Sequence, residues 1–481
     1  MKQRPVLGVI VGNRTFFPDA LVKEGRSEIL SLLEASGIDV VIVDEQATAL
    51  GAVETWQEAQ ICADLFRANV DRIDGILVTL PNFGDEGGVS DAIRLSGLHV
   101  PILVQAYPDE VDQFGPARRR DSFCGKISVC NNLTQYGFPF SLTDLHTVAP
   151  RSASFETDLR RFIGTCNVVN GMRHARLGMV GTRPSAFRTV RFSEKLLEAA
   201  GVSVSVIDLS DVHGEVGKID DADPRVNRKI EAIRAYVDTA FVPQEPLERM
   251  ARFAVVLDAW MERLGLQATA IQCWDSMQNN FGFNACTVMS MMSNNLLPSA
   301  CETDITGLTM MYALQLASGR PSALADWNNN YGGDPDKCVF WHCGTWAKNL
   351  VPDERIDTSP IHRSLGLDNT WGALHGRAPA GAITFGRITT DDARGEIRAF
   401  VGEGVMTDDP LDTYGTRAVV NVPSLQGLLK LMCLMGFEHH VAMNGSEVAY
   451  SVGQALERYL GWTVYRQTEW EAGLPVLSRS R

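Results

Sequence analysis

The sequence predicts an α/β protein: two Rossmann-like parallel-sheet domains, followed by a mainly antiparallel β C-terminal domain with helices. Three observations support this fold class. Continuous apolar runs alternate with helical patterns through the first two domains, as in parallel sheets covered on both faces. Farther along, Gly-rich segments with alternating apolar positions indicate antiparallel strands and turns. A chain of 481 residues also exceeds what one hydrophobic core usually serves.

The first domain is expected over residues 1–165. Its strands are runs such as "PVLGVIVG", bounded by turn residues, and its helices are amphipathic segments that stop at Gly or Asn. The expected strands are residues 5–12, 38–44, 73–81 and 100–107, and the expected helices are residues 20–37, 55–69 and 87–97.

The second domain is expected over residues 166–352 and the third over residues 353–481. The second repeats the strand and helix alternation, beginning with the strand "ARLGMVGTR" and including the strand "QATAIQCW". Short apolar runs close it, among them "PSACETDI", "SALADWN" and "CVFWHCGTW". The third combines the Gly-rich segment 376–410 with a helix at 423–437, a strand at 439–445 and a helix at 446–462.

Composition and charge exclude several classes of partner. The net charge is −14, which argues against nucleic acid and against an anionic membrane surface. No stretch approaches the ~18 apolar residues of a membrane span. The N-terminal apolar run is too short for a secretory signal, so a cytoplasmic protein is expected. The composition does not exclude binding of a small anionic ligand.

The ten cysteines are scattered singly. Cys338 and Cys343 flank a His, but no second pair accompanies them, so the pattern favours reduced, buried thiols over a structural zinc site. Cys301 and Cys343 are each adjacent to a candidate functional residue. On a strand, neighbouring side chains point to opposite faces, so both thiols are expected to point elsewhere.

Polar residues follow several expected strands, where parallel α/β sheets gather functional groups. They are Gln272, Trp274, Glu302, Asp326 and His342, and the strand that opens the last part of the chain adds His439 and His440. Two carboxylates and one His suit an octahedral divalent ion such as Mn²⁺ or Mg²⁺. Such an ion polarises a sugar carbonyl, and a carboxylate beside it can move a proton between adjacent carbons.

Two residues of the first domain are candidates for substrate binding. Arg14 follows the first strand, the usual place for a ligand-binding group. Lys126 lies in a nearly uncharged stretch and can contact an anionic or hydroxyl group, or extend to solvent.

The chain resembles the L-fucose isomerase/L-arabinose isomerase family, as a short member of L-fucose isomerase type. The resemblance covers nearly the whole chain. The motifs that carry it are "GNRTFFP", "FCGKISVCN", "IQCW", "ACETDITG", "ADWNNNYGGDPDKCVFWHCG" and "GFEHHVAMN".

The resemblance implies a ketol isomerase that binds Mn²⁺, with Mg²⁺ or Co²⁺ as substitutes. Glu302 and Asp326 match the two acidic ligands and the acid/base pair that moves a proton between C1 and C2 of an open-chain aldose. The third ligand falls on the His pair, with His439 preferred and His440 as the alternative. The arabinose branch makes His342 a further ligand or a donor beside the metal. The mechanism is expected to pass through an ene-diol, with a hydride shift as the alternative.

Partners and substrate also follow from the resemblance. It implies a homo-oligomer, a hexamer in related enzymes, with active sites near subunit interfaces to which the Arg14 and Lys126 regions contribute. The shorter third domain leaves the sugar open among L-fucose, D-arabinose and a 6-substituted hexose such as sulfoquinovose. A sulfonated sugar needs a cationic pocket, for which Arg14, Lys126, Arg183 and Arg188 are available. The alternative function is a cytoplasmic sugar-binding protein without catalysis.

Overall fold

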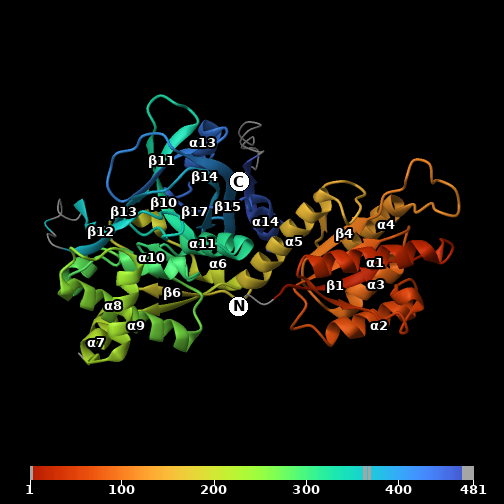
Figure 1. Ribbon diagram of the computed structural model, residues 1–481, viewed down its shortest axis with the longest axis horizontal. Helices are drawn as coiled ribbons and strands as arrows, with labels where there is room; N and C mark the ends of the chain where they lie inside the picture. Colours follow the sequence, from red (N-terminus) through yellow and green to blue (C-terminus); the bar gives the residue numbers. More distant parts are fainter. Residues whose placement is uncertain (1–3, 221, 361–365, 367–369, 468–481) are drawn as a thin grey trace. The chain divides into compact units, whose positions relative to one another are not determined.

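The computed structural model describes residues 4–220, 222–360, 366 and 370–467. It divides into two compact units (Figure 1). Unit 1 comprises residues 1–170 and 458–460, and unit 2 comprises residues 171–457 and 461–481. No helix among the described residues is both long and apolar enough to cross a membrane.

Unit 1 contains a five-stranded parallel sheet in the order β2-β1-β3-β4-β5. Every residue of its central strands β1, β3 and β4 is buried, as expected for strands covered by helices on both faces. The strands are β1 (Val6–Val11), β2 (Asp39–Ile42), β3 (Gly75–Leu80), β4 (Ile102–Ala106) and β5 (Ser141–Leu142). The helices are α1 (Asp19–Ala35), α2 (Trp56–Arg67), α3 (Glu86–Ser96), α4 (Ser122–Gln135) and α5 (Ala153–Met172).

Unit 2 begins with a four-stranded parallel sheet in the order β7-β6-β8-β9. Its strands are β6 (Arg176–Val180), β7 (Ser203–Ile207), β8 (Ala268–Ile271) and β9 (Ser299–Cys301). Its helices are α6 (Glu194–Ala199), α7 (Leu209–Lys218), α8 (Pro224–Tyr236), α9 (Gln244–Leu264), α10 (Cys286–Asn294) and α11 (Ile305–Ser318). Helix α11, which is buried from Ile305 to Gln315, also contacts strands of the next sheet, and so it links the two halves of unit 2.

The second sheet of unit 2 has nine strands in the order β12-β13-β16-β11-β10-β17-β14-β15-β18. Its strands are β10 (Ser322–Asn330), β11 (Lys337–His342), β12 (Arg355–Thr358), β13 (Trp371–Arg377), β14 (Gly381–Asp391), β15 (Glu396–Thr407), β16 (Thr416–Asn421), β17 (His440–Asn444) and β18 (Thr463–Arg466). Because β15 also pairs with β16, six strands close into a ring. The helices of this part are α13 (Leu425–Met435) and α14 (Ala449–Gln454).

These sheets confirm the predicted fold class, with parallel α/β parts followed by a mainly antiparallel sheet. One difference concerns the segments 322–328 and 338–346, which the sequence analysis assigns to the second domain. They form β10 and β11, a pair in the nine-stranded sheet. A short apolar run shows that a strand is present, but it carries no information about which sheet the strand joins. The division into three domains stays a prediction.

Gly307, in the first turn of α11, is predicted to be intolerant of a side chain. A Cβ there would lie 2.5 Å from Asp304 Oδ2 and 2.6 Å from Arg387 Nη1, and both of these side chains are fully buried. We expect Gly307→Ala to destabilise the protein by about 1–3 kcal/mol, the usual cost of overpacking. The matched control is Gly214→Ala in α7, where a Cβ meets nothing within 4 Å. Because Ala favours helices, this control should stabilise by about 0.5–1 kcal/mol. Thermal and urea unfolding measure both, and equal stability of the two variants would contradict the prediction.

Candidate active site

Glu302 occupies a sharp turn between β9 and α11. Glu302 and Thr303 both have left-handed backbone angles, with φ of 60° and 53°, a conformation that side chains other than Gly rarely adopt. The turn buries the Glu302 carboxylate, whose Oε1 accepts a 3.0 Å hydrogen bond from the indole N–H of Trp274. Its other oxygen, Oε2, is buried without a hydrogen-bond partner among the described residues. A buried carboxylate oxygen left in this way favours a cation beside it.

Strand pairing places Asp326 opposite His440, and both lie next to Glu302. They face one another across the antiparallel pair β10–β17. His440 Nε2 lies 3.4 Å from Asp326 Oδ1 and 3.0 Å from Glu302 Oε2. The second contact is close but is not aligned as a hydrogen bond. One imidazole nitrogen and two carboxylates therefore converge on one point.

The other nitrogen of His440 is held by a buried ionic network. His440 Nδ1 lies 2.8 Å from Asp304 Oδ2, and Arg387 contacts both oxygens of Asp304. Arg387 Nε also donates to Glu438 Oε2 at 3.0 Å. The carboxylate fixes the orientation of the ring and directs Nε2 toward Glu302 and Asp326. An imidazole held by a carboxylate in this way is a common arrangement for a metal-binding His.

Asp304, Arg387 and Glu438 are absent from the sequence-based candidates. Asp304 offered a usable signal, because an Asp directly before a helical run is a typical helix N-cap, and here it accepts a hydrogen bond from the Gly307 N–H at 2.9 Å. Arg387 offered none, since a single Arg in an alternating strand normally faces solvent. Only the closed ring of strands shows that this Arg is fully buried.

The charges of the site shift the pKa values of its members in opposite directions. Burial raises the pKa of Glu302, but His440 and then His342 bring it below its ordinary value. Burial also raises the pKa of Asp326, and there it prevails over the nearby imidazoles. Burial lowers the pKa of His440, but the carboxylates of Asp304 and Glu302 raise it to about 10. The carboxylates of Asp304 and Glu302 thus favour the protonated form of His440.

The structure distinguishes the two members of the His pair. His440 is 1% exposed, whereas the side chain of His439 is 44% exposed, with Nε2 3.7 Å from Asp326 Oδ1. Burial and then the neighbouring His440 lower the pKa of His439 to about 4. His439 therefore lies at the rim of the site and His440 at its centre.

His342 lies next to His440 and Glu302. Its ring centroid is 5.8 Å from that of His440, and one of its nitrogens groups with Glu302 and His440 within the reach of a single ion. Burial lowers the pKa of His342, but Cys343 and Asp326 raise it to about 9. His342 also groups with Cys301 and Cys343. The expectation that the thiol points away from the adjacent candidate was wrong for Cys343, whose Sγ lies 3.3 Å from His342 Nδ1. Cys343 follows the end of β11, where the alternation of a strand no longer holds.

The remaining candidates divide between the two units. Trp274 contacts Glu302 directly, and its ring packs against Phe187 at a centroid distance of 5.3 Å. Phe187 also reaches His439 and His440, at 5.7 and 6.1 Å. Gln272 accepts the backbone N–H of Thr182 at 2.9 Å, which ties β8 to the loop that carries Phe187.

Arg14 and Lys126 belong to unit 1 and make their bonds there. Arg14 pairs with Glu86, and its guanidinium lies 4.1 Å from the centre of the Phe83 ring. Lys126 is buried and donates to Thr143 Oγ1 at 2.7 Å, and burial lowers its pKa to about 8.

The residues present fit a divalent metal ion. Two sets of side chains, Glu302–His342–His440 and Asp326–His439–His440, each bring three ligand atoms within 4.8 Å of one another. Oxygen and imidazole ligands suit Mn²⁺, Mg²⁺ or Co²⁺. The unpartnered Oε2 of Glu302 is the position that such an ion would satisfy. A cation there would also neutralise the carboxylates that otherwise hold a proton on His440.

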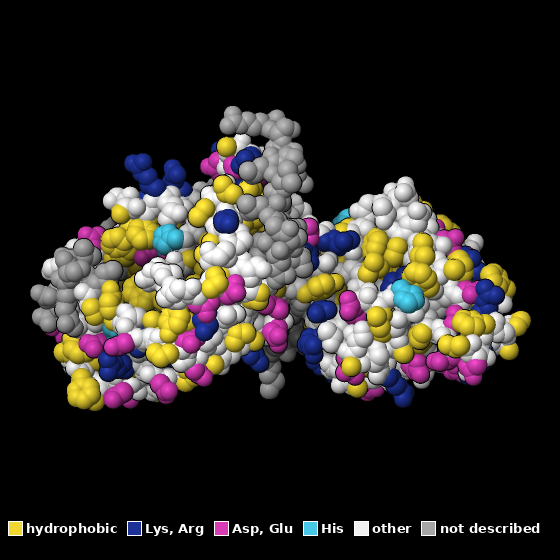
Figure 2. All heavy atoms as spheres, turned by 90° about the horizontal axis from the view of Figure 1, so that it is seen from above, with side chains coloured by type: hydrophobic (Ala, Val, Ile, Leu, Met, Phe, Trp, Pro, Cys, Tyr) yellow, Lys and Arg dark blue, Asp and Glu magenta, His cyan; other side chains and the backbone are white. Residues whose placement is uncertain are grey.

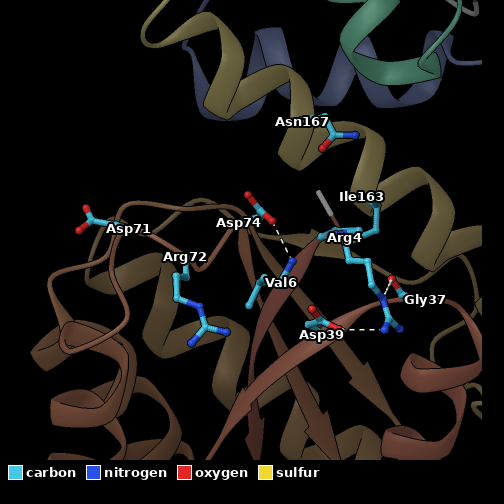
Figure 3. Close-up of a pocket in the computed structure, with 10 residues that line it drawn as sticks. Arg4, Val6, Gly37, Asp39, Asp71, Arg72, Asp74, Ile163 and Asn167 are labelled. Carbon is cyan, nitrogen blue, oxygen red and sulfur yellow. Dashed lines mark hydrogen bonds and ion pairs between the residues drawn. The ribbon is translucent and has the colours of Figure 1, made fainter. Parts of the chain in front are cut away.

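A hollow of unit 1 lacks comparable chemistry. It has a volume of about 580 Å³ and lies where β1 and β3 begin (Figure 3). Several of its charged groups are engaged with one another or with the backbone, since Arg4 pairs with Asp39 at 3.3 Å and Asp74 accepts the Val6 N–H at 2.8 Å. Ligands of parallel sheets bind at the opposite, carboxyl edge. The candidate active site is therefore the cluster in unit 2.

Two family models match this chain in succession. Residues 8–173 match the N-terminal domain of fucose/sulfoquinovose isomerases, and residues 340–467 match the C-terminal domain of L-fucose isomerase. A sulfoquinovose isomerase of Priestia aryabhattai is 24% identical over 92% of this chain and 95% of its own length. One from Alkalicoccus urumqiensis is 24% identical over 73% of this chain and 77% of its own length.

A solute-binding protein of a Burkholderia multivorans ABC transporter overlaps 66% of this chain and 95% of its own. Its sequence identity to this chain is 13%, and the TM-score is 0.17. The two domain models, in contrast, match in the expected order along the chain. The chain belongs to the L-fucose isomerase-like family of aldose–ketose isomerases.

Proposed function

We propose that the protein is a Mn²⁺-dependent isomerase that interconverts a 6-sulfonated aldose and its ketose, with the cluster in unit 2 as its active site. The observation that carries the proposal is the convergence of Glu302, Asp326 and His440, with Oε2 of Glu302 buried beside His440 Nε2 and making no aligned hydrogen bond. Glu302, Asp326 and His440 would hold the ion, and His342 borders it. When bound, the ion supplies Lewis-acid polarisation of the substrate carbonyl.

The two carboxylates carry out the proton transfers. Isomerisation moves one proton from C2 to C1 and another from the C2 oxygen to the C1 oxygen, with no net gain or loss of electrons. Glu302, whose pKa is lowered, stays ionised and suits the base that takes the C2 proton. Asp326, whose pKa burial raises, suits the group that moves a proton between the oxygens. The Trp274 indole keeps the Glu302 carboxylate in place.

His440, rather than its neighbour His439, is our choice for the imidazole ligand. Its Nδ1 is engaged by Asp304, so Nε2 is the free nitrogen, and Nε2 faces both acids. His439 is suited to contact the sugar instead, since it lies at the exposed rim beside Phe187.

The sulfonated substrate is supported by the relatives and by the loop that carries Phe187. Sulfoquinovose isomerases match nearly the full chain at 24% identity. Phe187 packs on Trp274 and on both residues of the His pair, and Arg183 and Arg188 lie in the same loop. A guanidinium is well suited to bind the oxygens of a sulfonate.

A homo-oligomer is supported by an exposed apolar face on unit 1. Figure 2 shows hydrophobic side chains gathered on the surface of unit 1. On α4 and the segment after it, Phe123, Ile127, Leu142 and Leu145 are 42–55% exposed. An apolar face of this kind is typical of a protein interface, and a second copy of the chain is the proposed occupant.

Metal removal tests the function. EDTA should lower aldose–ketose conversion by about 100-fold or more, and Mn²⁺ should restore it, because Lewis-acid polarisation contributes several kcal/mol. The assay follows ketose formation from sulfoquinovose, L-fucose, D-arabinose, L-arabinose and D-glucose. Glu302→Gln and Asp326→Asn should stay inactive after Mn²⁺ is added. A protein that binds one of these sugars but converts none in any metal would instead be a sugar-binding protein.

The His pair provides a matched comparison. His440→Gln should weaken Mn²⁺ binding by more than about 100-fold, because a ligand matters at least as much as the groups that orient it. His439→Gln should keep Mn²⁺ affinity within about tenfold and mainly raise KM. Electron paramagnetic resonance of free Mn²⁺ measures binding independently of turnover. The reverse order of the two variants would make His439 the ligand.

The loop arginines test the substrate class. Arg183→Gln or Arg188→Gln should raise KM for sulfoquinovose about 10–100-fold, the equivalent of a lost charge-assisted hydrogen bond. KM for a neutral aldose should change little in the same variants. Arg228→Gln, an exposed change on α8, is the control. Equal effects on charged and neutral sugars would place the sulfonate elsewhere.

A further inference from the structure

A group of soft ligands lies beside the acidic cluster. Cys301 ends β9, His342 ends β11, and Cys343 follows it directly. One ligand atom from each of the three lies within 4.8 Å of the others. We propose that Cys301, His342 and Cys343 form a second metal site, selective for thiophilic ions such as Zn²⁺ and Cd²⁺.

The spacing suits tetrahedral coordination. Zinc binds sulfur at about 2.3 Å and imidazole nitrogen at about 2.0–2.1 Å, which makes the edges of a tetrahedron about 3.6–3.8 Å long. Cys343 Sγ lies 3.3 Å from His342 Nδ1. The remaining ligand atoms are within 4.8 Å of one another, so side-chain adjustments of up to about 1 Å are sufficient. Three protein ligands are enough for a site that keeps its fourth position open.

Metal binding would change the hydrogen bonding and the protonation of these ligands. His342 Nδ1 accepts the Cys343 backbone N–H at 3.0 Å and lies 3.3 Å from Cys343 Sγ. The ion must displace that N–H. Binding releases one proton from each thiol to solvent and leaves two thiolates on the metal, with no change of oxidation state. A third sulfur, Cys286 Sγ, lies 4.0 Å from Cys343 Sγ.

The two sites share one residue. His342 groups with Cys301 and Cys343, and also with Glu302 and His440. An ion held by the thiols therefore withdraws His342 from the acidic cluster, and because the two thiolates balance its charge, the loss of this imidazole is the main effect on that cluster. If the proposed isomerase function holds, on which this consequence rests, Zn²⁺ or Cd²⁺ inhibits the Mn²⁺ enzyme from a neighbouring position.

Cadmium titration tests the site directly. The full-length protein, stripped with EDTA, is titrated with Cd²⁺ while the ultraviolet cadmium–thiolate charge-transfer absorption is recorded. We expect one equivalent to give this absorption. The double variant Cys301→Ser/Cys343→Ser should lose it. Cys433→Ser, a change at an exposed cysteine on α13, should retain it. No absorption in the unaltered protein, or full absorption in the double variant, overturns the proposal.

Two further measurements guard against misfolding and against failure of the functional proposal. His342→Gln keeps both thiols and should weaken Cd²⁺ binding about tenfold or more, whereas unchanged affinity removes His342 from the site. In the Mn²⁺ enzyme, one equivalent of Zn²⁺ should lower turnover at least about tenfold, and the double variant should resist it. A protein that converts no aldose but binds Cd²⁺ through these thiols retains the second site and loses only the isomerase assignment.

Discussion

The buried pairing of Arg387 with Asp304 is the interaction on which the active site depends. Arg387 and Asp304 are both fully buried, and the pair joins β14 of the nine-stranded sheet to the start of α11. Asp304 caps α11 and also orients His440, while Arg387 also binds Glu438, which lies two residues before His440. Removing one partner of a buried pair typically costs about 3–5 kcal/mol, because the other charge remains uncompensated. Each charged side chain of this buried network has a partner on a different element.

The network explains how one site can be assembled from two sheets. Glu302 follows a strand of the parallel sheet, whereas Asp326 and His440 belong to the ring of antiparallel strands. Helix α11 begins beside Glu302 and packs on β10, β14 and β17. Helix packing therefore brings the parallel sheet and the ring together, and the ionic network determines the orientation of the imidazole. The backbone is strained locally at Glu302, in the left-handed turn where the parallel sheet leads into α11.

Much of this arrangement could be predicted from the sequence, and the remainder has physical reasons. The apolar runs of β1 and β3 predict buried parallel strands because such strands lack the alternation of a half-exposed sheet. The acids Glu302 and Asp326 could be selected because they follow or end apolar segments. The sheet to which β10 and β11 belong could not be predicted, because several strands that pair with them are distant in the chain. The choice between His439 and His440 likewise depends on Asp304 and Arg387, whose burial is a tertiary property.

The closed ring of six strands constrains changes in strand register, whereas the loop between β6 and α6 lies outside that ring. Asp326 and His440 are neighbours in a ring without free edges, so a shift in register at either strand would have to be accommodated by every other strand. The loop with Arg183, Phe187 and Arg188 lies outside that ring, between β6 and α6. In the proposed function, the residues that transfer protons and the residues that bind the sulfonate therefore lie on separate elements. Substitutions in the loop would then change the sugar that is bound, while Asp326 and His440 keep their spacing.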